Sequence, residues 1–197
     1  MAGSYDPTTA LLVVDMQNDF ADPAGSLYVA GGEDVVEPVN QEIEWASRSG
    51  AAIVYTQDWH PPTTPHFAKD GGVWPVHCLA DSWGARFHPS LRIVDGADVV
   101  RKGQGGEDGY SAFSVREPTT GEHADTGLEE ILRARGVRNV VIVGLATDYC
   151  VKETGLDAIR LGFGATVVTD AIGAVDLNPG DGTRALETIR AAGVKLA

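Results

Sequence analysis

The sequence predicts an α/β fold with one doubly wound, mostly parallel sheet and helices on both faces. Apolar runs of strand length alternate with segments whose apolar residues recur at helical spacing. The strand runs are apolar throughout rather than at every second residue, which is typical of parallel strands buried on both faces. A chain of 197 residues can bury the core of one such domain, so we expect a single domain over residues 1–197.

The chain opens with a strand and a helix. Residues 10–14 are uniformly apolar and end at Asp15, which predicts the first strand. Residues 35–49 predict a helix that ends at Gly50, a common residue at helix C-termini. The apolar residues at helical spacing in this segment are Val36, Val39, Ile43 and Ala46.

Two further strands are separated by a long segment. Residues 51–56 predict a second strand whose extension ends at Asp58, and residues 98–101 predict a short third strand that ends at Lys102. Between them, residues 59–97 are rich in Pro, Gly, His and Trp and show little periodicity. Loops of this length are usually functional or disordered, and the aromatic residues favour an ordered, packed loop over a linker.

A polar, glycine-rich loop over residues 103–123 leads to the next expected helix. Asp125 or Thr126 can cap this helix, and Gly136 ends it. Its apolar positions are Leu128, Ile131, Leu132 and Ala134.

The rest of the chain continues the alternation of strand and helix. Residues 137–143 predict a fourth strand and residues 149–161 a helix. Residues 165–169 predict a fifth strand, 183–192 a helix and 194–196 a terminal strand. Right-handed crossovers between parallel strands then give the doubly wound arrangement.

The composition excludes several classes of partner. The net charge is −13, whereas nucleic-acid binding needs clustered Lys and Arg, so we expect no nucleic acid. No apolar run approaches the about 18 residues that span a bilayer, and residues 1–7 do not resemble a signal peptide. We therefore expect no membrane partner. The chain has only two cysteines, Cys78 and Cys150, so we expect no disulfide framework and a cytoplasmic location. The oligomeric state stays open, a homo-oligomer included.

Four strands end in polar or reactive residues. Asp15, Asp58, Lys102 and the 145–150 turn each follow a predicted strand. In doubly wound sheets, ligands bind outside the carboxyl ends of the strands. We therefore expect these residues to share one rim.

Cys150 is a candidate nucleophile because it lies where a strand stops and a helix begins. Free N–H groups and the helix dipole favour a thiolate at such a place. Asp15 can take the thiol proton as general base, and Lys102 can stabilise the carboxylate and the thiolate. The alternative is an ion pair between Asp15 and Lys102 beside an inert, buried cysteine.

A second group of residues has the composition of a metal site. Its members are Asp58, His60, His66 and His77, which lie within 20 residues of one another. Imidazole and carboxylate ligands suit Zn²⁺, Fe²⁺ or Mn²⁺, and the spacing does not choose among them. The alternative is a set of ordinary polar loop residues.

Several motifs follow one another from about residue 10 to the end of the chain. They are DMQNDF (15–20), GSL (25–27), TQDWHP (56–61), WPVHC (74–78), KG (102–103), YSAF (110–113) and GLATDYCV (144–151). In their order and spacing, these motifs together resemble the nicotinamidase/pyrazinamidase group of the isochorismatase-like cysteine hydrolase family.

This resemblance implies the isochorismatase-like hydrolase fold and an amidase that converts nicotinamide to nicotinate for NAD salvage, and pyrazinamide hydrolysis is expected as well. It implies a catalytic triad of Asp15, Lys102 and Cys150, and one divalent metal ion, with zinc favoured over iron or manganese. The implied metal ligands are Asp58, His60, His66 and His77, and the implied substrate-binding residues are Phe20, Trp74, Tyr110 and Leu145.

The resemblance also implies an oxyanion hole formed by the N–H groups of Ala146 and Cys150, with a cis peptide bond between Leu145 and Ala146. The expected reaction passes through a thioester on Cys150. Three alternatives remain: attack by metal-bound hydroxide, another small amide as substrate, and a non-catalytic metal-binding or redox-sensing domain.

Overall fold

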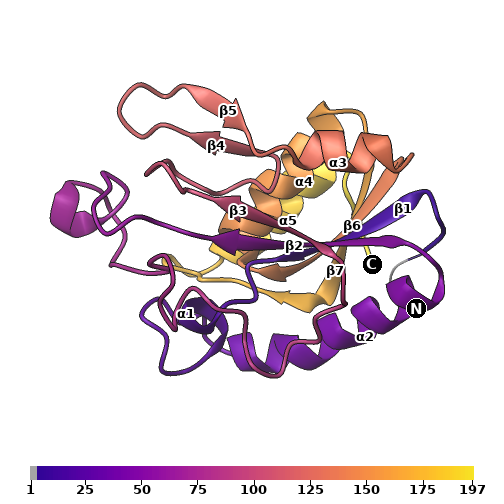
Figure 1. The fold of residues 1–197 in the computed structure, drawn as a ribbon, viewed down its shortest axis with the longest axis horizontal. Coiled ribbons are helices and arrows are strands. Elements are labelled where there is room, and N and C mark those ends of the chain that lie inside the picture. The colour runs from indigo at the N-terminus through magenta and orange to yellow at the C-terminus, as the bar shows by residue number, and fades with distance from the viewer. Residues whose placement is uncertain (1–3) are drawn as a thin grey trace.

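The computed structural model describes residues 4–197 and, over that range, contains a central six-stranded sheet flanked by helices (Figure 1). Residues 1–3, which begin the segment considered for a signal peptide, lie outside the described residues. The sheet has the strand order β3-β2-β1-β6-β7-β8, and each neighbouring pair in it is parallel. The predicted mostly parallel sheet is therefore confirmed.

The elements alternate along the chain. The central strands are β1 (Thr9–Val14), β2 (Ala52–Asp58), β3 (Asp98–Lys102), β6 (Asn139–Leu145), β7 (Gly164–Gly173) and β8 (Lys195–Leu196). The α-helices are α1 (Asn18–Ala21), α2 (Val36–Arg48), α3 (Leu128–Ala134), α4 (Lys152–Arg160) and α5 (Asp181–Ala191). Short 3-10 turns lie at Gly32–Val35 and Ala68–Asp70, and a π-helical turn lies at Thr147–Val151. β4 (Ser114–Arg116) and β5 (His123–Asp125) form a separate antiparallel hairpin.

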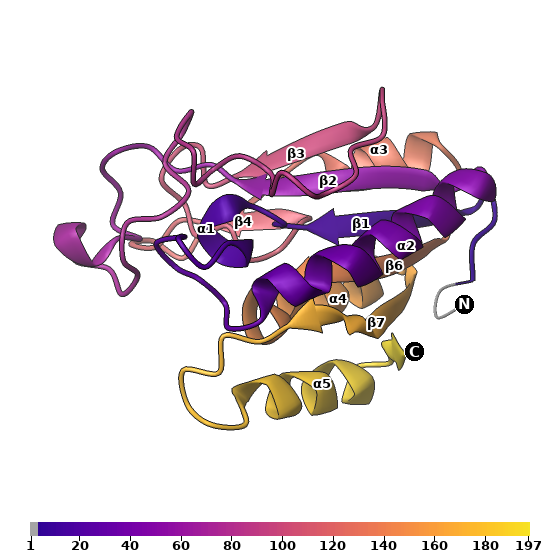
Figure 2. The same cartoon turned by 90° about the horizontal axis from the view of Figure 1, so that it is seen from below.

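Helices cover both faces of the sheet because each strand alternates its side chains between the faces. Leu11 and Val13 of β1 share a buried cluster with the apolar face of α2. Leu12 and Val14 belong to a second cluster with residues of α3, α4 and α5. Figure 2 shows α2 running across the sheet in front of β1 and β6. Burial on both faces explains why the strands are apolar throughout.

The structure corrects the predicted end of the fifth strand. β7 continues to Gly173, four residues beyond the predicted end at Thr169. Its pairing with β6 shifts register between Ile142 and Gly144, which is the sign of a β-bulge. Thr169 and Asp170 are exposed at this irregularity, so their polar side chains resemble a strand end in the sequence.

Two predicted helix starts are also wrong. The helix with Leu128 begins after Gly127, which occupies the N-cap position in a left-handed conformation. Asp125 is instead the last residue of β5. Thr126 precedes the N-cap residue Gly127, and its hydroxyl oxygen accepts a hydrogen bond from the Leu128 N–H. The helix predicted from residue 149 begins earlier, as the π-helical turn that contains Cys150.

The predicted loop over residues 103–123 contains β4 within it, and the hairpin projects beyond the sheet (Figure 1). Within residues 4–197, helices of the length and apolar character that a bilayer crossing requires are absent.

Candidate active site and metal centre

The candidate site lies at the carboxyl ends of four neighbouring strands. Asp15 follows β1, Asp58 and Lys102 end β2 and β3, and Leu145 ends β6. Asp58 and Lys102 are also register partners in the sheet. Because β3, β2, β1 and β6 are adjacent in that order, the fold brings these strand ends to one rim, as predicted.

Lys102 joins two buried carboxylates. Its Nζ lies 2.6 Å from Asp15 Oδ2 and 3.2 Å from Asp58 Oδ1. A thiol completes the group, since oxygen atoms of Asp15 and Asp58 and the Cys150 sulfur all lie within 4.8 Å of one another. The structure therefore brings the three predicted triad residues together, and their catalytic roles stay predictions.

The surroundings raise the pKa of both the Cys150 thiol and the Lys102 ammonium. Burial raises the pKa of Cys150 well above its usual value, although Lys102 opposes this shift. Burial tends to lower the pKa of Lys102, but the carboxylates of Asp15 and Asp58 raise it well above its usual value. A nucleophilic thiolate at this place therefore needs a base nearby, and Asp15, the predicted base, has a carboxylate oxygen within 4.8 Å of the sulfur, as does Asp58.

Two side chains outside the predicted set hold these carboxylates in place. The Thr56 hydroxyl donates a 2.6 Å hydrogen bond to Asp15 Oδ1, and it accepts the Asp15 N–H at 3.2 Å. The side-chain amide of Gln17 donates a 2.8 Å hydrogen bond to the Asp58 carbonyl oxygen and accepts one of 2.8 Å from the Asp58 N–H. Gln17 lies in a motif quoted above, and Thr56 shares a strand face with Asp58, so the sequence carried a signal for both.

Three imidazoles form a compact cluster beside Asp58. Nitrogen atoms of His60, His66 and His77 lie within 4.8 Å of one another, and all three side chains are buried. Asp58 Oδ2 lies 3.7 Å from His60 Nε2 and 3.8 Å from His77 Nε2. The four predicted ligands are thus neighbours in space.

The cluster fits a divalent cation. Among the described residues, neither ring nitrogen of His60 has a hydrogen-bond partner, although both are buried. A buried polar atom without a partner is costly, and a metal ion bound by imidazole and carboxylate would satisfy it. Such a set suits zinc, iron or manganese, so it indicates a divalent metal without identifying it.

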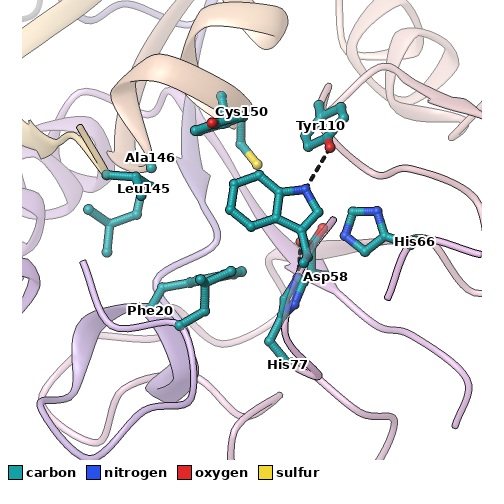
Figure 3. A pocket seen from close by; sticks show the side chains of 12 residues that line it. Phe20, Asp58, His66, His77, Tyr110, Leu145, Ala146 and Cys150 are labelled. Carbon is teal, nitrogen blue, oxygen red and sulfur yellow. Dashed lines mark hydrogen bonds and ion pairs between the residues drawn. The ribbon is translucent and has the colours of Figure 1, made fainter. Parts of the chain in front are cut away.

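A cavity of about 30 Å³ lies between the thiol and the imidazoles. In Figure 3 the side chains of Phe20, Cys150, Tyr110 and His66 point into it. Phe20, Trp74, Tyr110 and Leu145, the predicted substrate-binding residues, all line this cavity. It is lined as well by three residues that were not predicted, namely Leu27, Tyr149 and Val175.

Aromatic contacts order one wall of the cavity. The indole N–H of Trp74 donates a 2.8 Å hydrogen bond to the Tyr110 hydroxyl. The Trp74 ring also meets the Tyr149 ring edge to face, with 4.9 Å between centroids. This wall offers a planar apolar ring both stacking and edge contacts.

The turn after β6 also lines the cavity. The peptide bond between Leu145 and Ala146 is cis, as the resemblance implied. Ala146 and Cys150 both line the cavity. Gly144 lets the turn approach β1, because a Cβ there would lie 2.0 Å from the Val14 carbonyl oxygen. The predicted oxyanion-hole residues are thus placed beside the thiol, and their role stays a prediction.

Known proteins share both the sequence and the fold. Residues 9–197 match the family described as the isochorismatase domain. The chain is 38% identical to the nicotinamidase of Escherichia coli strain K12 over 206 positions, which cover 96% of this chain and 94% of that protein.

Solved structures agree. The pyrazinamidase of Pyrococcus horikoshii in complex with zinc matches with a TM-score of 0.86 and 37% identity, covering 97% of this chain and 99% of that one. PnC1 from L. infantum in complex with nicotinate matches with a TM-score of 0.87 and 35% identity, covering 100% of this chain and 96% of that one.

Proposed function

Because the chain belongs to the isochorismatase domain family, we propose that it hydrolyses nicotinamide to nicotinate and ammonia through a thioester on Cys150. One observation carries the proposal. The Cys150 thiol and two of the three clustered imidazoles, those of His66 and His77, line a single cavity with aromatic side chains, and the buried Asp15–Lys102 ion pair lies beside that thiol. A named nicotinamidase at 38% identity supports the choice of substrate.

Substrate binding uses residues that line the cavity. Phe20 and Trp74 hold the pyridine ring by apolar and stacking contacts. A divalent cation held by the four ligands named above would orient the ring nitrogen as a Lewis acid. The carboxamide carbon then faces the Cys150 sulfur, which borders the same cavity.

The acylation step needs one proton transfer in each direction. Asp15 takes the thiol proton, and the sulfur forms a bond to the carboxamide carbon. The N–H groups of Ala146 and Cys150 stabilise the resulting oxyanion, and loss of one such donor typically costs about 3–4 kcal/mol. Asp15 returns the proton to the amine nitrogen, so the C–N bond breaks, ammonia leaves and the thioester remains.

In the deacylation step, Asp15 transfers protons in the same way, with water in place of the thiol as the nucleophile. Asp15 removes a proton from a water molecule, whose oxygen attacks the thioester carbon. The C–S bond breaks, the Cys150 thiol is restored with the proton from Asp15, and nicotinic acid leaves and gives up its carboxyl proton to solvent as nicotinate. Lys102 stays charged throughout and keeps the carboxylate of Asp15 ionised between transfers.

The decisive experiment compares the wild type with Cys150→Ala and measures both nicotinate formation and metal content. We expect Cys150→Ala to bind metal normally and to lose turnover by about 10³-fold or more. Cys78→Ala removes the other buried thiol and serves as the matched control. Substantial turnover by metal-loaded Cys150→Ala would instead indicate attack by metal-bound hydroxide.

Substrate range distinguishes the remaining alternatives. Nicotinamide and pyrazinamide, which share a planar ring, should be hydrolysed in preference to carbamoyl or maleamate-type amides. A wild type that releases ammonia only from the latter would assign the site to another small amide. A metal-loaded wild type that releases none would favour a non-catalytic metal-binding or redox-sensing domain.

We also propose that one domain over residues 1–197 carries the whole reaction and that its nicotinate enters NAD salvage. Both cysteines are free, which suits the reducing cytoplasm as the place of action. The metal proposed first is zinc, which the P. horikoshii pyrazinamidase structure holds.

A further inference from the structure

Asp108 carries a partly buried carboxylate that no sequence pattern singled out. It lies between β3 and β4, and its side chain is only 12% exposed. Its Oδ1 lies 2.6 Å from Nδ1 of His66, one of the three clustered imidazoles. The contact spans 42 residues of sequence, so it depends on the fold.

We propose that Asp108 is a positioning residue that sets the tautomer of His66 for metal binding, an inference that rests on the proposed metal-dependent function. A carboxylate only accepts hydrogen bonds, so Nδ1 of His66 carries the proton that it donates to Asp108. In the neutral ring the lone pair is then on Nε2, which is free to bind a cation.

The three imidazoles have different partners on their outer nitrogens. His77 donates from Nδ1 to the carbonyl oxygen of Pro75 at 2.8 Å, which also leaves Nε2 free. His60 has no hydrogen-bond partner on either nitrogen among residues 4–197. The partner of His66 is charged, and hydrogen bonds to carboxylates are roughly twice as strong as neutral ones. Asp108 therefore orients its imidazole more firmly than a backbone carbonyl does.

The hairpin holds Asp108 in place. The backbone of Asp108 exchanges two hydrogen bonds with Arg116 of β4, at 2.7 and 3.0 Å. The Arg116 guanidinium also lies 3.9 Å from Asp108 Oδ2. The β4–β5 hairpin thus supports the carboxylate from the side away from His66.

The next residue connects the same segment to the candidate triad. The Gly109 carbonyl accepts a hydrogen bond from Lys102 Nζ. A Cβ on Gly109 would lie 2.9 Å from Asp58 Oδ1, so only glycine fits without a shift. Two consecutive residues therefore contact a ligand imidazole, a ligand carboxylate and the bridging lysine.

The test measures zinc affinity rather than turnover. Purified wild type, Asp108→Ala and Asp108→Asn are stripped of metal and titrated with zinc against a chromophoric chelator. We expect Asp108→Ala to weaken zinc binding by about 10–100-fold, the usual effect of losing a partner of a metal-ligating histidine. Asp108→Asn, which keeps an acceptor oxygen without its charge, should fall between. Glu107→Gln is the matched control, since Glu107 contacts the Gly105 N–H and should leave zinc affinity unchanged.

A spectroscopic signature separates positioning from a merely structural role. In the zinc-loaded wild type, NMR of ¹⁵N-labelled histidine should show the His66 ring protonated on Nδ1 and metal-bound through Nε2. Asp108→Ala should lose or shift that Nδ1–H signal while the His77 signal stays. If Asp108→Ala does not fold, Asp108→Asn and the wild-type spectrum still decide the question.

Unchanged zinc affinity in Asp108→Ala or Asp108→Asn, a His66 ring protonated on Nε2, or a wild type that binds no zinc would overturn the inference. The proposed function fails separately. A wild type that binds zinc with the predicted dependence on Asp108, but does not hydrolyse nicotinamide, would refute the function and leave this inference standing.

Discussion

Thr56 offers a sharp test of how Asp15 is held. The fully buried hydroxyl donates a 2.6 Å hydrogen bond to the carboxylate of Asp15. Thr56→Val keeps the side-chain volume close to the original but removes that donor. A hydrogen bond to a charged group contributes about 1.5–3 kcal/mol. At 1.36 kcal/mol for each tenfold change in rate, its loss should lower kcat/KM for nicotinamide by about 10–150-fold.

The control variant is Thr56→Ser, which keeps the hydroxyl and loses one buried methyl group. That methyl is worth about 0.8 kcal/mol of stability, so the serine variant should be slightly less stable but nearly as active as the wild type. Initial rates of nicotinate formation at saturating metal, measured for all three proteins, give the comparison. Thermal unfolding curves then separate loss of fold from loss of chemistry.

The pH profile supplies a second, independent readout. Burial raises the pKa of Asp15, whereas Lys102 and the hydrogen bond from Thr56 lower it. Asp15 acts as a base in its ionised form, so the acid limb of kcat/KM reports its deprotonation. Removing the donor should raise the pKa of Asp15 and move that limb to higher pH. A Thr56→Val enzyme with wild-type rates and an unmoved acid limb would refute the role given to this hydroxyl.

Three further outcomes follow from the same geometry. Lys102→Gln leaves the carboxylates of Asp15 and Asp58 without their cation, so turnover should fall by about 10³-fold. Breaking a buried ion pair costs about 3–5 kcal/mol of stability, so calorimetry should show a melting temperature lowered by about 6–20 °C. Chelation of the metal should abolish nicotinamide turnover, and it should lower the melting temperature by about 5–10 °C relative to the protein with zinc at 100 times its Kd. Added zinc should restore both the turnover and the melting temperature. Turnover unaffected by full chelation would contradict the metal site. Asp148→Ala removes a carboxylate that accepts hydrogen bonds from two backbone N–H groups in the loop after β7, including that of Val175. Because Val175 lines the cavity, KM should rise more than kcat falls. Steady-state kinetics with an unchanged KM would contradict this prediction.

The sequence predicted those parts of the molecule that depend on local pattern. Uniformly apolar runs marked the parallel strands because burial on both faces leaves no polar position. The residues at strand ends were predictable for a related reason, since a parallel sheet brings all its carboxyl ends to one rim. Asp15, Asp58 and Lys102 were found in this way, and the structure places them in contact through the lysine.

Features that depend on distant contacts escaped prediction. The carboxylate of Asp108 lies in a glycine-rich segment without periodicity, and only the folded chain brings it to His66. The extension of β7 escaped because a bulge exposes polar residues within the strand. The π-helical turn around Cys150 has no sequence period of its own, so an ordinary helix was expected there.

The lining of the cavity was predicted in part. The residues taken from quoted motifs, such as Phe20 and Trp74, do line it. Val175 was missed because it comes from the segment after β7, which lacks a recognisable motif and is placed by hydrogen bonds to Asp148. Cavity residues that are placed by long-range hydrogen bonds cannot be recognised from the spacing of residues in the sequence.

The two oxygen atoms of Asp58 face different neighbours. Oδ2 lies toward His60 and His77, and Oδ1 lies toward Lys102, which in turn holds Asp15. A cation that draws electron density from Oδ2 therefore weakens the ion pair between Oδ1 and the Lys102 ammonium. Because Lys102 also pairs with Asp15, the general base is affected by the change at the metal. Exchanging one metal for another in this protein should consequently alter the rate of bond breaking, as well as how tightly the pyridine ring is held.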